Sequence, residues 1–307
     1  SGIKQGICDK FITNCKSLKS KKASGDKIGK LKFKSYTNVI PLKQYKHTYN
    51  INFDKNTIRI QNIKQVFKVK GLKQIPDDAE ICNAELIRKA SEYYIHVVTY
   101  VPKEIKQTTG KQIGLDFGIK SNITLSNGEK YNINVPESKG TKLASRRMNR
   151  KKKGSENHQK ARQKLRVAYE KDTNKRLDAA KKLVSYLDSY TLIAFQDENL
   201  QSWHKDFGKS VQHSAMGFIK AALKTKANSI MIDRYFPSTQ ICPVCGKLTK
   251  HHLSKRDYDC NYCGYHHNDR DVKAAQMNLD YANVSPGRRA NSPVELKTSV
   301  FEAFLQV

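Results

Sequence analysis

Two Cys-x-x-Cys pairs constrain the fold of this chain more than any other feature of its sequence. Cys242 and Cys245 form the first pair, Cys260 and Cys263 form the second, and fourteen residues separate the pairs. Four thiolates at this spacing can enclose one Zn2+ tetrahedrally, so the sequence predicts one structural Zn2+ in a zinc ribbon at 241–264. Two disulfides are the alternative, which a reducing compartment disfavours. A closed shell of four thiolates has no open position, so we do not expect this zinc to catalyse hydrolysis.

The balance of charge points to a polyanionic partner. The 307 residues include 57 Lys and Arg against 28 Asp and Glu, a formal charge of +29. Such an excess favours contact with many phosphates, and the 15 tyrosines could stack on bases. Anionic membrane is the rival partner, but the basic residues are spread along the chain, and no apolar run reaches the roughly 18 residues that span a bilayer. We therefore expect a soluble, cytoplasmic and nucleoid-associated monomer of a prokaryotic host, with nucleic-acid partners and no membrane partner.

The first third of the chain has the periodicity of β-strands. Over 28–109 apolar and polar residues alternate, beginning near Phe33 and Tyr36, and turn-forming residues interrupt the alternation. This pattern predicts a small antiparallel β-barrel. The preceding residues 1–27 are polar and rich in Lys and Ser, and residues 285–307 are expected to form a C-terminal tail.

Beyond residue 110 the pattern changes to that of an α/β domain. Short runs of β-forming residues alternate with a long stretch of helical periodicity, in which Leu177, Ala180 and Leu183 recur on one face. We predict one α/β domain over 110–240, completed after the cysteine motif by 265–284. Its strands and helices are expected at 113–116, 122–125, 139–187 and 191–195.

The helical stretch 139–187 is strongly basic and is the candidate nucleic-acid interface. A solvated helix face is the usual explanation for a run of charge, but the only acid of this stretch before Glu170 is Glu156. The near absence of acids favours contact with nucleic acid. The candidate contacts are Arg146, Arg147, Arg150, Lys151, Lys152, Lys153, Lys160, Arg162 and Lys164.

Acidic residues outside the cysteine motif have settings that suit metal ligands. Asp116 follows the apolar residues of a predicted strand, and Asp271 would lie in the first turn of a helix, where the helix dipole keeps a carboxylate ionised. The predicted strand 191–195 leads into Asp197 and Glu198, which point to opposite faces if the strand continues. Only one of them can then share a site with Asp116, and spacing alone does not choose between them. Taken singly, each acid is more often a helix cap or a salt-bridge partner than a catalyst.

The motifs form an ordered set along the chain. The segments GLDFGIKSNITLSNG, AFQDENL, CPVCG, CNYCG and NDRDVKAAQMNL occur in this order. Together they resemble the three split catalytic motifs and the zinc ribbon of the TnpB family, RNA-guided nucleases encoded by insertion sequences. The resemblance covers about 28–280 and implies an α/β RNase H-like (RuvC) nuclease domain with an inserted zinc ribbon, preceded by a small antiparallel β-barrel (wedge) domain. It implies that Asp116, Glu198 and Asp271 are the catalytic acids.

The resemblance also implies a chemistry and partners. The three acids would hold two Mg2+ about 4 Å apart, and the enzyme would hydrolyse phosphodiesters of a double-stranded DNA target. A guide RNA made from the transposon end would select that target. Two features depart from the family pattern. Lys273 stands where the family usually has Asn, and family members begin with a strand and a helical recognition region that would precede this chain, so 1–27 is expected to be a remnant of that region.

Three other functions fit part of the pattern. A nuclease-inactive RNA-guided DNA-binding protein would keep the fold, but all three acids are present here. A small type V CRISPR effector would share every motif and would differ only in its neighbouring locus. A transposase is less consistent with the motifs, because they do not include a tyrosine nucleophile beside paired histidines.

Overall fold

The computed structural model describes residues 2–30, 32–33, 35–102, 108–252, 254–284 and, for the backbone alone, 298–306. The chain divides into two compact units, Ser1–Glu104 with Glu295–Val307, and Ile105–Val294. None of the helices among the described residues is both long enough and apolar enough to cross a membrane.

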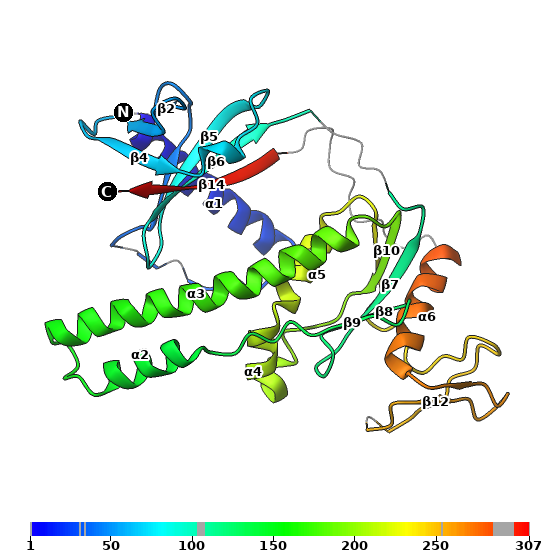
Figure 1. The fold of residues 1–307 in the computed structure, drawn as a ribbon. Helices are drawn as coiled ribbons and strands as arrows, with labels where there is room; N and C mark the ends of the chain where they lie inside the picture. Colours follow the sequence, from blue (N-terminus) through cyan, green and yellow to red (C-terminus); the bar gives the residue numbers. More distant parts are fainter. Residues whose placement is uncertain are drawn as a thin grey trace. The chain divides into compact units, whose positions relative to one another are not determined.

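An antiparallel sheet of seven strands forms most of the first unit (Figure 1). Its order is β1-β5-β6-β14-β4-β3-β2, so β1 and β2 are its edges and closure into a barrel remains a prediction. Alternate residues such as Tyr49, Ile58 and Ile95 are buried in one core. The helix α1 (Gly2–Ala23) packs against β1. The strands are β1 Val39–Leu42, β2 Tyr49–Asn52, β3 Thr57–Ile60, β4 Val66–Lys70, β5 Glu80–Arg88, β6 Tyr93–Tyr100 and β14 Thr298–Gln306, with a short 3-10 helix at Leu72–Gln74.

Two expectations for this unit are wrong. Residues 298–306 are not a tail, because they form β14 between β6 and β4; the rest of the predicted tail, 285–297 and 307, lies outside the described residues. The strand expected near Phe33 and Tyr36 is absent from the described residues there, and these rings are exposed by 95% and 73%.

A mixed sheet of five strands forms the centre of the second unit. Its order is β11-β10-β7-β8-β9, in which β7, β10 and β11 are parallel and the hairpin strands β8 and β9 are antiparallel to their neighbours. The predicted strands at 113–116, 122–125 and 191–195 correspond to β7, β8 and β10. The strands are β7 Gln112–Phe117, β8 Ile123–Leu125, β9 Lys130–Tyr131, β10 Leu192–Gln196 and β11 Ser229–Ile232.

Helices cover both faces of this sheet (Figure 1). On one face Leu115 and Phe195 pack against α3, α4 and α5, whereas on the other Ala194 packs with residues of β11 and α6. The predicted helical stretch 139–187 forms α2 and α3, and the hydroxyls of Ser138 and Ser155 cap their first turns. The helices are α2 Lys139–Asn149, α3 Glu156–Leu187, α4 His204–Ser214, α5 Met216–Lys224 and α6 Arg270–Val284, and a two-stranded ribbon, β12 Tyr258–Asp259 and β13 His266–His267, precedes α6.

Candidate active site and cysteine cluster

Asp116 lies on the central strand of the five-stranded sheet, near the carboxyl end of that strand. The parallel neighbours β7 and β10 are in register, with Gly114 beside Ala194 and Leu115 beside Phe195. Side chains alternate between the faces of a strand, so Asp116 lies on the same face as Gly114 and Ala194, which is the face that α6 covers. Parallel strands also end at one edge of a sheet, so the carboxyl ends of β7 and β10 lie together.

Gly114 allows α6 to pass very close to β7. A Cβ atom at Gly114 would lie 1.9 Å from the carbonyl oxygen of Ala275 in α6, so no other residue fits there without moving the helix. The buried amide of Asn278 donates from Nδ2 to the carbonyl oxygen of Leu115 over 2.9 Å. The glycine of the first motif and the helix of the third are therefore complementary, and their contact brings the start of α6 toward Asp116.

Asp271 occupies the first turn of α6. The carboxylate of Asp269 caps this turn, because its Oδ1 accepts from the backbone N–H of Asp271 over 3.0 Å and from that of Val272 over 3.2 Å. The Asp271 carboxylate is thus not used as a cap, and Arg256 Nη1 lies 3.8 Å from its Oδ2.

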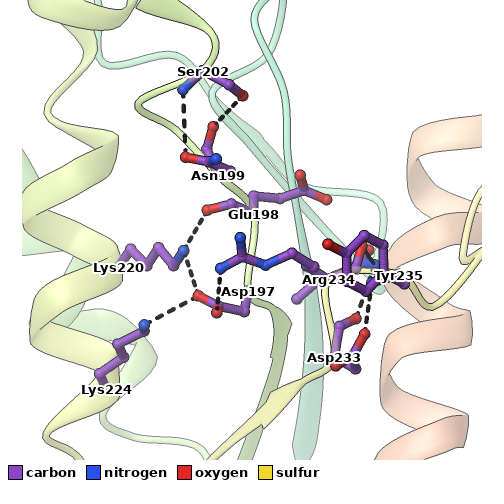
Figure 2. A network of polar contacts seen from close by, with 10 residues as sticks. Asp197, Glu198, Asn199, Ser202, Lys220, Lys224, Asp233, Arg234 and Tyr235 are labelled. Atoms are coloured by element: carbon purple, nitrogen blue, oxygen red, sulfur yellow. Dashed lines mark hydrogen bonds and ion pairs between the residues drawn. The ribbon is translucent and has the colours of Figure 1, made fainter. Parts of the chain in front are cut away.

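The structure distinguishes the two acids that follow β10. Asp197 points toward α5, where its carboxylate lies 2.6 Å from Lys220 Nζ and 3.0 Å from Lys224 Nζ, and it also contacts Arg234 at 3.1 Å. Burial would raise the pKa of Asp197, but these three cations outweigh it and hold that pKa well below its ordinary value. Figure 2 shows the carboxylate of Glu198 directed away from Lys220 and Lys224. Asp197 is therefore neutralised by its neighbours, whereas the charge of Glu198 acts on Asp116.

Two of the three acids, Asp271 and Glu198, act electrostatically on the third, Asp116. Burial raises the pKa of Asp116 well above its ordinary value of 3.8, and the negative charges of Asp271 and Glu198 raise it further. Arg270 and Lys273 oppose this rise. Burial also raises the pKa of Glu198, against the influence of Lys220 and Arg234. Such mutual repulsion in a poorly solvated place is what a bound cation would relieve.

The three acids nevertheless do not form a compact group of metal-binding atoms. Among the described residues, two groups have metal-binding atoms that all lie within 4.8 Å of one another: the four cysteines, and Asp257 with Asp259 and His266. The three acids do not form a third such group. Asp259 is already engaged by Lys255 and by His266 Nδ1.

The four cysteines of the two motifs form one cluster. Cys242 and Cys263 have their sulfur atoms 3.6 Å apart, and those of Cys245 and Cys260 are 3.5 Å apart. A tetrahedron with Zn–S bonds of about 2.3 Å has sulfur–sulfur edges of about 3.8 Å, so the cluster has the size that Zn2+ requires. Burial would raise the pKa of Cys260, but backbone N–H groups of Cys263 and Tyr262 outweigh it and lower this pKa to about 6.

Glycines close both turns of the cluster. Gly246 and Gly264 have φ values of 69° and 71°, a left-handed conformation that side chains with a Cβ rarely adopt. Their N–H groups donate to the carbonyls of Cys242 and Cys260 over 3.0 and 3.2 Å. The glycine after each cysteine pair is thus explained by the backbone of the turn.

Lys273 connects α6 to the cysteine cluster. Its side chain is 1% exposed, and Nζ donates to the carbonyl oxygens of Ser238 over 2.9 Å and Ile241 over 2.8 Å. The same Nζ lies 4.0 Å from the centroid of the Tyr258 ring. Burial lowers the pKa of Lys273 to about 8. The residue that departs from the family pattern is therefore a buried link between the helix of Asp271 and the segment that leads into Cys242.

All nine basic residues proposed as nucleic-acid contacts are exposed on α2, α3 and the loop between them. Lys153, Arg162 and Arg166 also line a hollow of about 460 Å3 together with His158. The hollow lies beside the first turns of α3, which Ser155 caps. The predicted basic surface is thus exposed, and part of it is concave.

Sequence reasoning missed the residues that hold Asp197. Lys220 and Lys224 lie one helical turn apart on an otherwise apolar helix, and this spacing could have indicated a shared acidic partner. It also missed Gln196, whose buried side chain faces the loop after β11. A polar residue at the end of an apolar strand was the available signal.

Comparison with known proteins connects these motifs to a family. A family model described as "Probable transposase" (OrfB_IS605) matches residues 95–192, and one described as "Cas12f1-like, TNB domain" matches residues 219–278. The first match includes Asp116, and the second includes the four cysteines and Asp271. A curated protein of Streptomyces pristinaespiralis, named "Putative RNA-guided DNA endonuclease", is 29% identical over 218 residues, which cover 66% of this chain and 54% of that protein.

The chain therefore spans about half the length of the curated relative that it matches. The matched segments contain GLDFGIKSNITLSNG, CPVCG, CNYCG and all but the last residue of NDRDVKAAQMNL, whereas AFQDENL, with Glu198, lies between them. Two family models and a curated relative thus confirm that this chain resembles the TnpB family.

Proposed function

We propose that the chain is an RNA-guided DNA endonuclease that hydrolyses phosphodiester bonds with the help of divalent metal ions. The observation that carries this proposal is the arrangement of three acids from distant motifs. Asp116, Glu198 and Asp271 come from the first strand, the middle and the last helix of the α/β unit, yet the charges of the last two both raise the pKa of Asp116. The name of the curated relative supports the guided mode of action.

The architecture supports an RNase H-like nuclease domain with a zinc ribbon inserted before its last helix. The central strand β7 of a mixed sheet carries Asp116, and helices cover both faces. The cysteine cluster has the size and donor set of a structural Zn2+ site. The ribbon contributes Ile241 and Tyr258 to the packing around Lys273, two residues from Asp271.

Carboxylates at the edge of the sheet suit Mg2+. Hard oxygen ligands are the donors that Mg2+ prefers, and burial together with the charges of Asp271 and Glu198 raises the pKa of Asp116, a cost that a bound cation would offset. Bound at these acids, two Mg2+ would supply an activated water and would stabilise the leaving oxygen. The chain would supply the geometry: β7 and β10 would hold Asp116 and Glu198 at one edge of the sheet, and the capped first turn of α6 would hold Asp271 near Asp116.

The RNA bound to the protein tests the guided mode. We would express the chain with its native flanking DNA, purify it and sequence the RNA that accompanies it. We expect one discrete RNA whose end extends beyond the transposon into the flanking sequence. The protein should cut DNA that matches this end when Mg2+ is present. Bulk cellular RNA, together with no cutting of matched DNA, would contradict the proposal.

The two acids after β10 should separate catalysis from stability. Glu198→Gln is expected to reduce cleavage at least about 100-fold, because a metal ligand is lost, while leaving the melting temperature unchanged or higher. Asp197→Asn should instead lower the free energy of unfolding by roughly 1–3 kcal/mol, because three cations lose their common partner, and should leave cleavage measurable below the melting transition. Cleavage rates and thermal melts of both variants provide the test. Efficient cutting by Glu198→Gln beside a folded but inactive Asp197→Asn would reverse the assignment.

We further propose that the basic surface of α2 and α3 contacts nucleic-acid phosphates. Arg146, Arg147 and Arg150 are exposed within two turns of one another. Each phosphate contact releases counterions, so binding through this surface must weaken as salt rises.

Neutralising these three arginines should change the salt dependence of binding. In an Arg146→Gln, Arg147→Gln, Arg150→Gln variant we expect the slope of log affinity against log salt for the co-purified RNA to fall by about 1 per lost contact. Lys175→Gln, Lys181→Gln, Lys182→Gln is the matched control, since these lysines are exposed on the far half of α3. Equal slopes for the two triple variants would argue against an interface at α2.

A further inference from the structure

The loop after β11 stands beside the proposed catalytic acids. Strand β11 is the parallel neighbour of β10, and the N–H of Asp197 donates to the carbonyl oxygen of Ile232 over 2.9 Å. The residues that follow β11, Asp233 to Phe236, therefore emerge at the same edge of the sheet as Glu198. Arg234 connects the two strand ends, because it contacts Asp197 and its charge lowers the pKa of Glu198.

Gln196 holds this loop in one conformation. Its Nε2 lies within 3.1, 3.0 and 2.7 Å of the carbonyl oxygens of Asp233, Arg234 and Phe236, and its Oε1 accepts from Ser238 Oγ over 3.0 Å. The side chain of Gln196 is 4% exposed, so these bonds are shielded from water.

Further contacts fix the two aromatic residues of the loop. The N–H of Tyr235 donates to Asp233 Oδ1 over 2.8 Å (Figure 2). The ring of Phe236 packs on that of Tyr281 in α6, with 4.4 Å between centroids. The loop is thus anchored to both β10 and α6.

On this anchored loop one ring faces solvent. The side chain of Tyr235 is 84% exposed, whereas the adjacent Phe236 is packed. A single exposed aromatic residue on a surface needs no explanation by itself. Tyr235 differs in two respects. The loop backbone around it is held by Gln196, by the Asp233 carboxylate and by the packing of Phe236 on Tyr281. In addition, its neighbour Arg234 contacts Asp197, the residue before Glu198. A rigid, exposed ring beside a site for phosphodiester hydrolysis is suited to stacking on a base.

We propose that Tyr235 stacks on a nucleobase of the DNA strand that is being cut and so positions the neighbouring phosphodiester at the acids. This inference rests on the proposed nuclease function. Every base has a π face, so the contact suits a single strand of any sequence, as a guided nuclease requires. Arg234, a partly exposed cation next to Tyr235 in sequence, would assist by attracting the phosphates of the same DNA strand. Tyr235 is a positioning residue here, and the acids remain the groups that act on the phosphate.

Kinetics of cleavage give the first test. With target DNA and Mg2+, Tyr235→Ala is expected to raise the half-saturating DNA concentration about 5- to 100-fold, in line with the usual worth of one base–aromatic stack. Tyr235→Phe should behave as wild type, because it keeps the ring. Tyr36→Ala is the control, since it removes another largely exposed ring, 73% exposed against 84% for Tyr235, from the β-sheet unit. Equal melting temperatures would show that all the variants fold.

A spectroscopic signature separates stacking from other effects. In an Asp116→Asn background, which prevents cutting, 2-aminopurine is placed at successive positions around the expected cut site of the target strand. Stacking should quench the fluorescence of 2-aminopurine at one or two of these positions. We expect this quenching with Asp116→Asn alone and with Asp116→Asn combined with Tyr235→Phe, because both proteins keep an aromatic ring at position 235. The quenching should be lost when Tyr235→Ala is added instead.

The outcomes distinguish the inference from the function on which it rests. If wild type cuts DNA but Tyr235→Ala matches Tyr36→Ala in the kinetics and leaves the quenching unchanged in the Asp116→Asn background, the stacking inference is wrong and the nuclease function stands. If Tyr235→Phe is as impaired as Tyr235→Ala, the hydroxyl is the important group and stacking is again wrong. If wild type neither cuts nor binds target DNA, the proposed function and the inference both fail. Quenching that depends on the ring without any cutting would support the stacking contact and overturn the nuclease.

Discussion

Asp116→Asn is expected to abolish DNA cleavage and, without divalent cations, to make the α/β unit more stable. Loss of a central metal ligand should reduce the cleavage rate at least about 100-fold. The stabilisation follows from the pKa of Asp116, which burial and the charges of Asp271 and Glu198 raise well above 3.8. The folded state therefore disfavours the ionised form of Asp116 relative to the unfolded chain, which lowers the stability of wild type at neutral pH. Asn has the same shape without that charge.

The sign of the effect can be tested with pH. Above pH 3.8 the native state binds more protons at Asp116 than the unfolded state does, so wild type loses stability as pH rises toward the raised native pKa. The variant lacks this loss, and the difference between the two proteins should widen across that range. A gain on the order of 1 kcal/mol would raise the melting temperature by roughly 2–4 °C.

Thermal melts with and without Mg2+ complete the test. Mg2+ should stabilise wild type, because it binds the folded acids, and should stabilise the variant less. Asp178→Asn is the matched control, since Asp178 is an exposed acid of α3 that pairs with Lys182. A lower melting temperature for Asp116→Asn in metal-free buffer would show that the carboxylate has a supporting role rather than a destabilising one.

The sequence predicted those parts of the site that depend on local pattern. The spacing of four cysteines was enough to predict a cluster, and the structure brings their sulfur atoms together. The apolar runs beside Asp116 and Asp197 predicted strands, and β7 and β10 confirm them. Their parallel register could not be deduced from either run alone, because it depends on a pairing across about 80 residues.

Other features required contacts that no local pattern contains. Asp197 and Glu198 are adjacent acids of similar chemistry, and only the lysines of α5 distinguish them. β14 was mistaken for a tail because its pairing partners, β6 and β4, lie some two hundred residues away. Phe33 and Tyr36 had the spacing of a strand, but the described residues around them form none. Period alone indicates a possible strand, and pairing decides whether it forms.

Lys273 shows how a departure from a family pattern can be understood from packing. The longer side chain reaches past the first turn of α6 to the carbonyls of Ser238 and Ile241. A buried ammonium is costly unless its hydrogens are satisfied, and here two carbonyls and the face of Tyr258 surround it. Lys273 consequently links the folding of the cysteine cluster to the position of Asp271.

Because of that coupling, Cys242→Ser is expected to abolish cleavage although Cys242 touches no proposed catalytic acid. Structural Zn2+ contributes on the order of 10 kcal/mol to the folding of small thiolate sites, so loss of one of four ligands should release the metal and disorder the ribbon. Ile241 and Tyr258 would then no longer enclose Lys273, whose exposed charge would favour fraying of the first turn of α6. Asp271 lies in that turn, so the acid would be displaced from Asp116.

Zinc content, proteolysis and cleavage measure the successive steps of this chain of effects. Wild type should contain one Zn2+ per chain, and Cys242→Ser should contain little, be cut by protease within 242–267 and fail to cleave DNA at any Mg2+ concentration. Cys8→Ser is the matched control, because Cys8 is an exposed cysteine outside the cluster, and it should retain zinc and activity. A zinc-free Cys242→Ser that cleaves DNA normally would show that Asp271 is held by α6 and β7 alone, through Gly114 and Asn278, and that the ribbon serves another purpose.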